Sequence, residues 1–183
     1  PAEPPAELPT VPAHPRALPA DNATIRLRGV SARWPGETHP AIAGVDLDLA
    51  PGDRVLVTGP SGAGKTTLAH VLVRFLDHGG AYTLGGVDVR EVHPDEVRRR
   101  VVLIEQSPHL FDTSIRQNLL FADDTADDER LAEVLDRVGL GDWMRARGGL
   151  DAPVGERGRL VSGGQAQRLA LARGLLSRAP VLV

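Results

Sequence analysis

Cysteine is absent from the 183 residues of this chain, which excludes disulfides and thiolate metal sites and fits a reducing compartment. Long hydrophobic runs are missing too. No apolar stretch approaches the roughly 18–20 residues that a bilayer span requires, so no part of this sequence is expected to cross a membrane. A net charge of −3 gives no electrostatic reason to expect a nucleic-acid partner. With 42% hydrophobic and 25% charged residues, the composition is typical of one globular domain.

Methionine is nearly absent as well. The chain begins at Pro1, and Met144 is its only methionine. It ends on the apolar residues 181–183, directly after a helical pattern. These features predict a piece of a longer protein that stops inside a buried strand.

Proline is concentrated at the start of the chain. Residues 1–20 contain seven prolines, a density that removes backbone donors and helical freedom. We therefore predict an extended or disordered linker over 1–20, which is either a plain flexible terminus or a spacer. A single domain is expected to occupy 21–183.

Short apolar runs alternate with helical patterns through this domain. Strands are predicted around 25–30, 45–49, 54–58, 101–104 and 181–183, and three of these runs (54–58, 101–104 and 181–183) read as strands buried on both faces. Helices are predicted over 65–76, 114–121, 127–138 and 163–176, with Leu68, Val71, Leu72 and Phe75 on the inward stripe of the first. The alternation indicates an α/β layered fold with a mainly parallel sheet.

A glycine-rich loop follows the 54–58 run. Gly59, Pro60, Ser61, Gly62, Ala63, Gly64, Lys65 and Thr66 match the pattern G-x-x-x-x-G-K-[ST] between a predicted strand and a helix. Glycines let such a loop turn its amides toward a phosphate, and a helix start adds a favourable dipole. The Lys65 ammonium suits the β- and γ-phosphates, and the Thr66 hydroxyl suits Mg²⁺. The loop predicts binding of a nucleoside triphosphate, with a chance glycine turn as the alternative.

A second glycine pair precedes the last helix. Ser162 is a suitable N-cap residue, and Gly163 and Gly164 leave the first amides of that helix accessible to an anion. By itself this turn is equally well explained as a flexible helix start. Its place in the same chain as the phosphate loop favours a second nucleotide contact.

Together these motifs resemble the ATPase domain of ABC transporters over residues 24–183. Val161–Gln165 resembles the family's LSGGQ signature with Val in place of Leu, and Gln106 matches the Q-loop glutamine. The resemblance implies a P-loop fold with a mainly parallel core sheet, an antiparallel β subdomain and a helical subdomain. It also implies ATP and Mg²⁺ as ligands, with Gln106 and Lys65 in catalysis and with Thr66 and Gln106 at the metal.

The same resemblance assigns further contacts with the nucleotide. Thr67 would complete the phosphate loop, and Trp34 stands where the family places an aromatic residue that stacks on adenine; a partly buried core tryptophan is the alternative. In the family two such domains pair head to tail, so Ser162, Gly163, Gly164 and Gln165 would act on a nucleotide held by the partner.

Two segments resemble those of ABC exporters, namely Val154–Gly158 (VGERG) and Phe111–Leu119. This similarity implies a second ATPase domain and a transmembrane domain as partners, no nucleic acid, and a place at the cytoplasmic face of the cell membrane. Within exporters, the combination of residues 44–69, 105–119 and 150–158 is most similar to bacterial heterodimeric thiol exporters associated with cytochrome bd assembly, which move cysteine or glutathione.

The chain departs from the family at its end, where the Asp–Glu pair that follows the next strand is not reached. We therefore expect a C-terminally incomplete domain that binds nucleotide, hydrolyses little and is poorly stable. A degenerate, non-hydrolysing subunit of a heterodimeric exporter is an alternative. An ABC-type ATPase of DNA repair or chromosome maintenance is a remote one, because no long coiled coil separates the two motifs.

Overall fold

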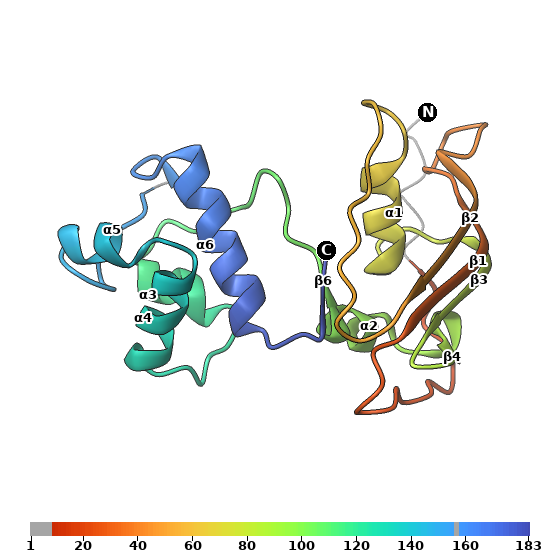
Figure 1. Ribbon diagram of the computed structural model, residues 1–183, viewed down its shortest axis with the longest axis horizontal. Coiled ribbons are helices and arrows are strands. Elements are labelled where there is room, and N and C mark those ends of the chain that lie inside the picture. The colour runs from red at the N-terminus through yellow and green to blue at the C-terminus, as the bar shows by residue number, and fades with distance from the viewer. Residues whose placement is uncertain (1–8, 156–157) are drawn as a thin grey trace. The chain divides into compact units, whose positions relative to one another are not determined.

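The computed structural model describes residues 9–155 and 158–183, and it divides into two compact units. Unit 1 comprises residues up to Leu103 together with Val183, and unit 2 comprises Ile104–Leu182. The elements of Figure 1 are β1 (Ile25–Ala32), β2 (Ile42–Leu49), α1 (Lys65–Leu72), β3 (Gly79–Leu84), β4 (Val87–Asp88), the 3₁₀ turn η1 (Val89–Glu91), α2 (Pro94–Arg100), β5 (Val101–Val102), α3 (Ile115–Leu120), α4 (Asp128–Arg137), α5 (Gly141–Ala146), α6 (Gly163–Leu176) and β6 (Val181–Leu182).

Unit 1 is built on an antiparallel sheet with the strand order β2-β1-β3-β4 (Figure 1). Ile25 and Leu27 on the central strand are fully buried, while Arg26 and Arg28, which alternate with them, are exposed and pair with Asp48 on β2. This alternation is the pattern of a sheet with one face on the core and one in solvent. The antiparallel β subdomain is therefore present. Strands β3 and β4 were not predicted from the sequence.

Two sequence predictions in unit 1 are wrong. The 54–58 run forms no strand, and its apolar side chains are 54%, 86% and 48% exposed at Val55, Leu56 and Val57. A run of apolar residues becomes a strand only where neighbouring strands supply backbone partners, and the described residues give this run no ladder. Helix α1 also ends at Leu72, because Arg74 adopts a left-handed φ of 55°, which leaves Phe75 47% exposed.

Part of the proline-rich segment lies among the described residues. Residues 9–20 contain no helix or strand. The backbone N–H of Arg16 donates to the carbonyl of Glu91 at 2.7 Å, and its guanidinium pairs with the Glu91 carboxylate at 2.6 Å. Further on, the N–H of Leu18 donates to Glu96 Oε1 at 2.8 Å. This stretch is thus fastened to η1 and α2 in unit 1.

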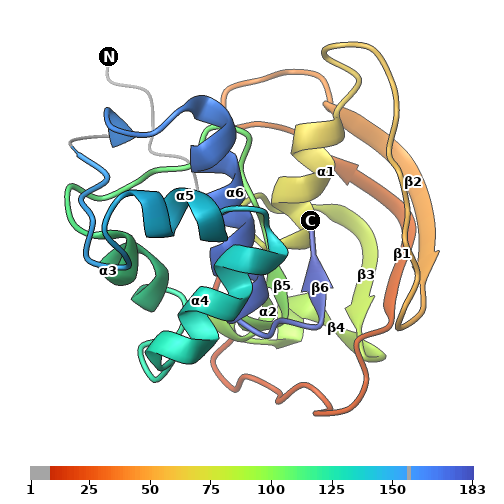
Figure 2. The ribbon, with the colours of Figure 1, turned by 60° about the vertical axis from the view of Figure 1, so that its left-hand side comes forward.

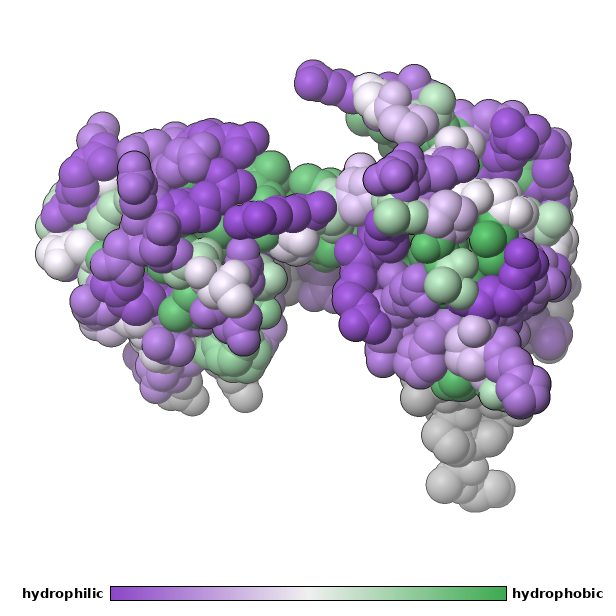
Figure 3. All heavy atoms as spheres, turned by 90° about the horizontal axis from the view of Figure 1, so that it is seen from below, coloured by the Kyte–Doolittle hydropathy of each residue, from purple (hydrophilic) through white to green (hydrophobic). Residues whose placement is uncertain are grey.

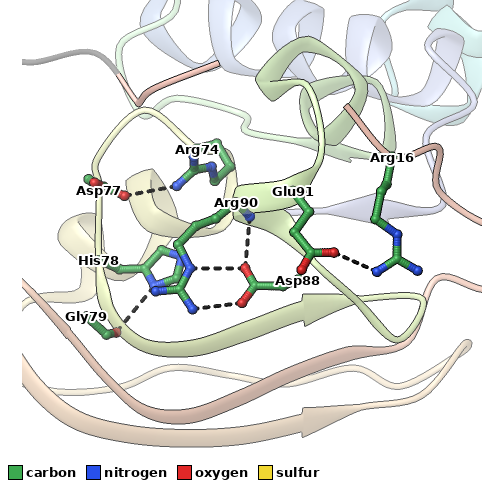
Figure 4. Close-up of polar contacts among 8 residues, drawn as sticks. All are labelled: Arg16, Arg74, Asp77, His78, Gly79, Asp88, Arg90 and Glu91. Carbon is green, nitrogen blue, oxygen red and sulfur yellow. Dashed lines mark hydrogen bonds and ion pairs between the residues drawn. The ribbon is translucent and has the colours of Figure 1, made fainter. Parts of the chain in front are cut away.

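A polar cluster follows α1 in unit 1 (Figure 4). Arg74 is 1% exposed and its Nη1 donates to Asp77 at 3.0 Å. His78 is 8% exposed, and burial, reinforced by the charges of Arg74 and Arg90, lowers the pKa of its ring. Asp88 accepts from Nε and Nη2 of Arg90, and these hydrogen bonds hold the pKa of the Asp88 carboxyl below its usual value. Burial therefore favours the neutral form of the His78 ring.

Unit 2 consists of helices around one apolar core, with α6 packed against α3 and α4 (Figure 2). Helices predicted over 114–121, 127–138 and 163–176 are confirmed as α3, α4 and α6, with caps at the expected ends. The apolar stripe that follows the helical period along α4 and α6 is buried, namely Leu131, Val134, Leu135, Val138, Leu169, Ala172 and Leu176. Strand β6 forms where expected, but Leu182 is 40% exposed, so that end of the chain is not buried as predicted.

The surface in the view of Figure 3 is dominated by hydrophilic residues on both units, with apolar residues in small groups among them. Within the described ranges, no helix combines the length and the apolar character that a bilayer crossing requires.

Candidate nucleotide site

The phosphate loop of unit 1 leads directly into α1. Gly64 is the N-cap and offers no side-chain cap, so the first amides of the helix stay available to an external acceptor. Lys65 reaches back over the loop, and its Nζ donates to the carbonyls of Gly59 and Pro60 at 2.8 Å each. Thr66 is exposed on the first turn of the same helix. An ammonium, free amides and a hydroxyl thus surround one short loop.

Gly64 is the position where the loop depends on glycine. Its φ is +87°, a left-handed conformation that L side chains rarely adopt. A Cβ there would stand 2.4 Å from Ile42 Cγ2 and 2.6 Å from the carbonyl oxygen of Ala41. The Ala41 carbonyl and the Ile42 side chain at the start of β2 therefore lie too close for any side chain, and glycine is required by both conformation and contact.

Trp34 lies in the same unit against the side of α1. Its indole Nε1 donates to Thr67 Oγ1 at 3.1 Å, and its ring meets His70 edge-on with centroids 5.2 Å apart. The Trp34 residue remains 37% exposed, whereas Thr67 is 5% exposed. The Thr67 hydroxyl accordingly holds the tryptophan, and stacking of Trp34 on a base stays a prediction.

In unit 2 the signature turn forms the start of α6. Ser162 Oγ accepts from the Gln165 N–H at 3.2 Å, while Gln165 Oε1 accepts from the Ser162 N–H at 2.8 Å, which together make a capping box. A Cβ built on Gly163 or Gly164 would meet nothing within 4 Å. Both glycines are exposed, and their amides belong to the first turn of a helix, where an anion is favoured.

Gln106 also belongs to unit 2, and its side chain is exposed. Its carbonyl oxygen accepts from Gln167 Nε2 at 3.1 Å, so α6 holds the backbone of this loop close to the signature turn. The other end of the loop is held by Arg173, whose Nη1 donates to the His109 carbonyl at 2.7 Å and whose Nε donates to the Asn118 carbonyl at 2.7 Å.

No role in holding this loop was predicted from the sequence for Gln167, Asn118 or Arg173. Asn118 did carry a signal, because it occupies the buried stripe of α3 beside Ile115 and Leu119, where a polar residue needs partners. No signal in the sequence indicated the contacts of Gln167 and Arg173, because their acceptors are backbone carbonyls far away in the sequence.

The phosphate loop and Trp34 thus lie in unit 1, and Gln106 and Ser162–Gln165 lie in unit 2. Of the exporter-like segments, Val154 and Gly158 are described, whereas Glu156 and Arg157 lie outside the described residues. The class of protein that these features define is a P-loop nucleotide-binding domain with a second anion-facing helix start.

Comparisons with known proteins identify the family. A family model described as ABC transporter matches residues 42–183. The ATP-dependent lipid A-core flippase of Thiobacillus denitrificans is 38% identical over 164 residues, which are 87% of this chain and 28% of the flippase. The glutathione/L-cysteine transport system ATP-binding/permease protein CydC of Escherichia coli K12 is 35% identical over 165 residues, which are 90% of this chain and 29% of CydC.

A solved structure of a bacterial Atm1-family ABC exporter with ATP bound matches with a TM-score of 0.86 and 31% identity, covering 94% of this chain and 30% of that one. The chain belongs to the ABC transporter family and has the fold of its nucleotide-binding domain. It spans less than a third of the length of the relatives named here.

Proposed function

We propose that this chain is the ATP-binding module of an ABC exporter, in which ATP binding and hydrolysis drive export through a transmembrane domain. The observation that carries the proposal is the presence of two exposed helix starts in one chain, Gly64–Lys65 with its ammonium and the Ser162 capping box with its glycines. Each presents free amides to an anion. The similarity to exporters and to an ATP-binding/permease protein supports the link to transport.

ATP would lie along the phosphate loop, with the γ-phosphate near the Lys65 ammonium and the base against Trp34. The residues present fit Mg²⁺ as well, because the Thr66 hydroxyl and the Gln106 side chain are exposed oxygen donors of the kind that this ion prefers. Bound Mg²⁺ would neutralise charge on the β- and γ-phosphate oxygens. Lys65 adds its positive charge, and Gln106 would orient the attacking water.

Ser162 and the amides of Gly163 and Gly164 would act on a nucleotide bound by a second ATPase domain. In the capping box the Ser162 oxygen accepts from Gln165, which leaves the Ser162 hydroxyl proton free to donate to a phosphate. Phosphoryl transfer depends on positioning and on charge neutralisation, so closing the site from a partner would make hydrolysis conditional on pairing. The transmembrane partner would place the module at the cytoplasmic face of the membrane.

Mixed protomers of the complete protein test this head-to-tail arrangement. Lys65→Ala removes the ammonium of the phosphate loop, and Ser162→Ala removes the signature hydroxyl. Each variant alone should lose ATP turnover. If the two motifs serve opposite nucleotides, a mixture of both variants recovers turnover, because one of the two sites in each mixed pair is intact. No recovery in reassembled pairs would contradict the arrangement.

For the substrate we propose a low-molecular-weight thiol, supported by the similarity to CydC, whose name states glutathione and cysteine transport. The lipid A-core flippases make a lipid the competing candidate. Uptake of labelled glutathione into inverted vesicles, compared with lipid translocation in the same vesicles, distinguishes the two. Single-turnover hydrolysis in the complete protein distinguishes a competent site from a degenerate, binding-only one.

A further inference from the structure

The segment that leads to the signature turn is held at two places by one side chain. Arg147 is the C-cap residue of α5 in unit 2. Its Nη2 donates to the carbonyl of Pro153 at 2.7 Å, and its Nη1 donates to the carbonyl of Leu160 at 3.1 Å. The two carbonyls lie on either side of the stretch that enters the signature, so one planar guanidinium ties both ends of it together.

The Arg147 side chain is fixed in this position by its surroundings. Its Cζ lies 5.3 Å from the centroid of the Trp143 ring, one turn earlier on α5, which is within the range of a cation–π contact. Among the described residues, its buried Nε has no hydrogen-bond partner. Arg147 therefore directs two of its donors to backbone carbonyls.

The anchoring points of this clamp are themselves fixed. The Val154 side chain is fully buried, and the Val154 N–H donates to Thr113 at 3.0 Å. The Leu160 N–H donates to the carbonyl of Val154 at 3.1 Å. Leu160 is two residues before Ser162, so the direction in which the chain enters the cap follows from how Leu160 is held. Ser162 is the N-cap of α6, and Gly163 and Gly164 form its first turn, so the clamp acts on the chain immediately before all three residues.

We infer that Arg147 is a positioning residue for the signature turn: its guanidinium clamp on Pro153 and Leu160 aims Ser162 and the amides of Gly163 and Gly164 at a phosphate of the partner-bound nucleotide. This inference rests on the proposed function of the signature. Lysine would not replace arginine here, because a single ammonium on a flexible stem cannot span two carbonyls in a fixed fork or stack on Trp143 in the same way.

The test uses Arg147→Met and Arg147→Lys in the complete protein. The matched control is Arg145→Met on the same helix, because Arg145 is exposed and pairs only with Asp136 and Asp142 in the described contacts. Both Arg147 variants should lower ATP turnover about tenfold or more, since small misplacements of a positioning group carry losses of that order. The Kd for ATP at the phosphate loop and the melting temperature should match those of Arg145→Met.

A double variant separates positioning from general stability. Arg147→Met combined with Ser162→Ala should turn over ATP no more slowly than Ser162→Ala alone, because both changes act through one turn. Hydrogen exchange provides a readout independent of turnover: amides of 161–165 should exchange faster in Arg147→Met, with those of α4 unchanged.

The outcomes are distinguishable. If Ser162→Ala lowers turnover but Arg147→Met does not, the inference fails and the proposed function stands. If Ser162→Ala leaves turnover unchanged, the proposed role of the signature fails, and the inference fails with it. A joint fall in melting temperature and ATP affinity in Arg147→Met, or unchanged exchange at 161–165, would overturn the positioning role and leave the function untouched.

Discussion

Replacing Asn118 with leucine tests how the loop after Gln106 is held. The Asn118 side chain is fully buried. Its Oδ1 accepts from the Phe111 N–H at 3.0 Å and from Nη2 of Arg173, and its Nδ2 donates to the carbonyls of Phe111 and Ser114 at 3.0 Å each. Burial lowers the pKa of the Arg173 guanidinium.

Asn118→Leu preserves size but leaves two donors unpaired, namely the Phe111 N–H and one arm of Arg173. The two carbonyls keep other partners, because the Thr113 N–H also donates to Phe111 and the Asn118 N–H also donates to Ser114. The two unpaired donors together cost about 2–6 kcal/mol and the buried leucine recovers about 1–2 kcal/mol, so the net loss should be about 2.5 kcal/mol at the centre of these ranges. Asn118→Asp keeps Oδ1 as the acceptor for both donors and adds an ion pair with Arg173, which outweighs the contact of its second oxygen with the two carbonyls, so it should lose less.

Urea unfolding followed by tryptophan fluorescence measures this loss. The chain has two tryptophans, Trp34 in unit 1 and Trp143 in unit 2, so a Trp34→Phe background reports on unit 2 alone. Gln117→Ala is the matched control, because Gln117 is the exposed neighbour on the same helix. The reasoning would be refuted if Asn118→Leu lowered the free energy of unfolding no more than Gln117→Ala does. It would also be refuted if the leucine and aspartate variants lost equal stability.

The remaining predictions concern unit 1. Gly64→Ala should weaken nucleotide binding and lower the free energy of unfolding by about 2–4 kcal/mol, because a left-handed φ and contacts below 3 Å act together; calorimetry and titration with ATP measure both. Trp34→Ala should weaken ATP binding by about 1–3 kcal/mol if the ring stacks on adenine, whereas Trp34→Phe should lose less; equal affinity in both would contradict stacking. Because the folded pKa of His78 lies below its unfolded value, its contribution to stability is complete above the unfolded pKa and is lost as the pH falls below about 6.5. The free energy of unfolding, measured by urea melts at pH values from 7.5 to 5, should therefore fall less steeply with decreasing pH in His78→Gln than in the unchanged protein. An equal pH dependence in the two proteins would count against this account.

Much of the fold was predictable from local sequence patterns. The 3.6-residue periodicity of α4 and the Ser162 start of α6 placed those helices with their caps, because these signals depend on neighbours within one or two turns. The glycines of the phosphate loop likewise predicted a helix start with free amides. The family followed from the same short motifs and is confirmed by the comparisons.

The sequence by itself determined which residues can cradle phosphates, since a loop that turns amides toward an anion needs glycine, lysine and threonine in a fixed order. Only the tertiary structure decided that residues 54–58 form no strand, that Thr67 holds Trp34, and that Arg147 and Asn118 fasten the loops around the signature and Gln106. The physical reason is the range of each interaction. A cap or an apolar stripe is completed by nearby residues, whereas a strand ladder or a buried side chain needs partners that the chain brings together only on folding.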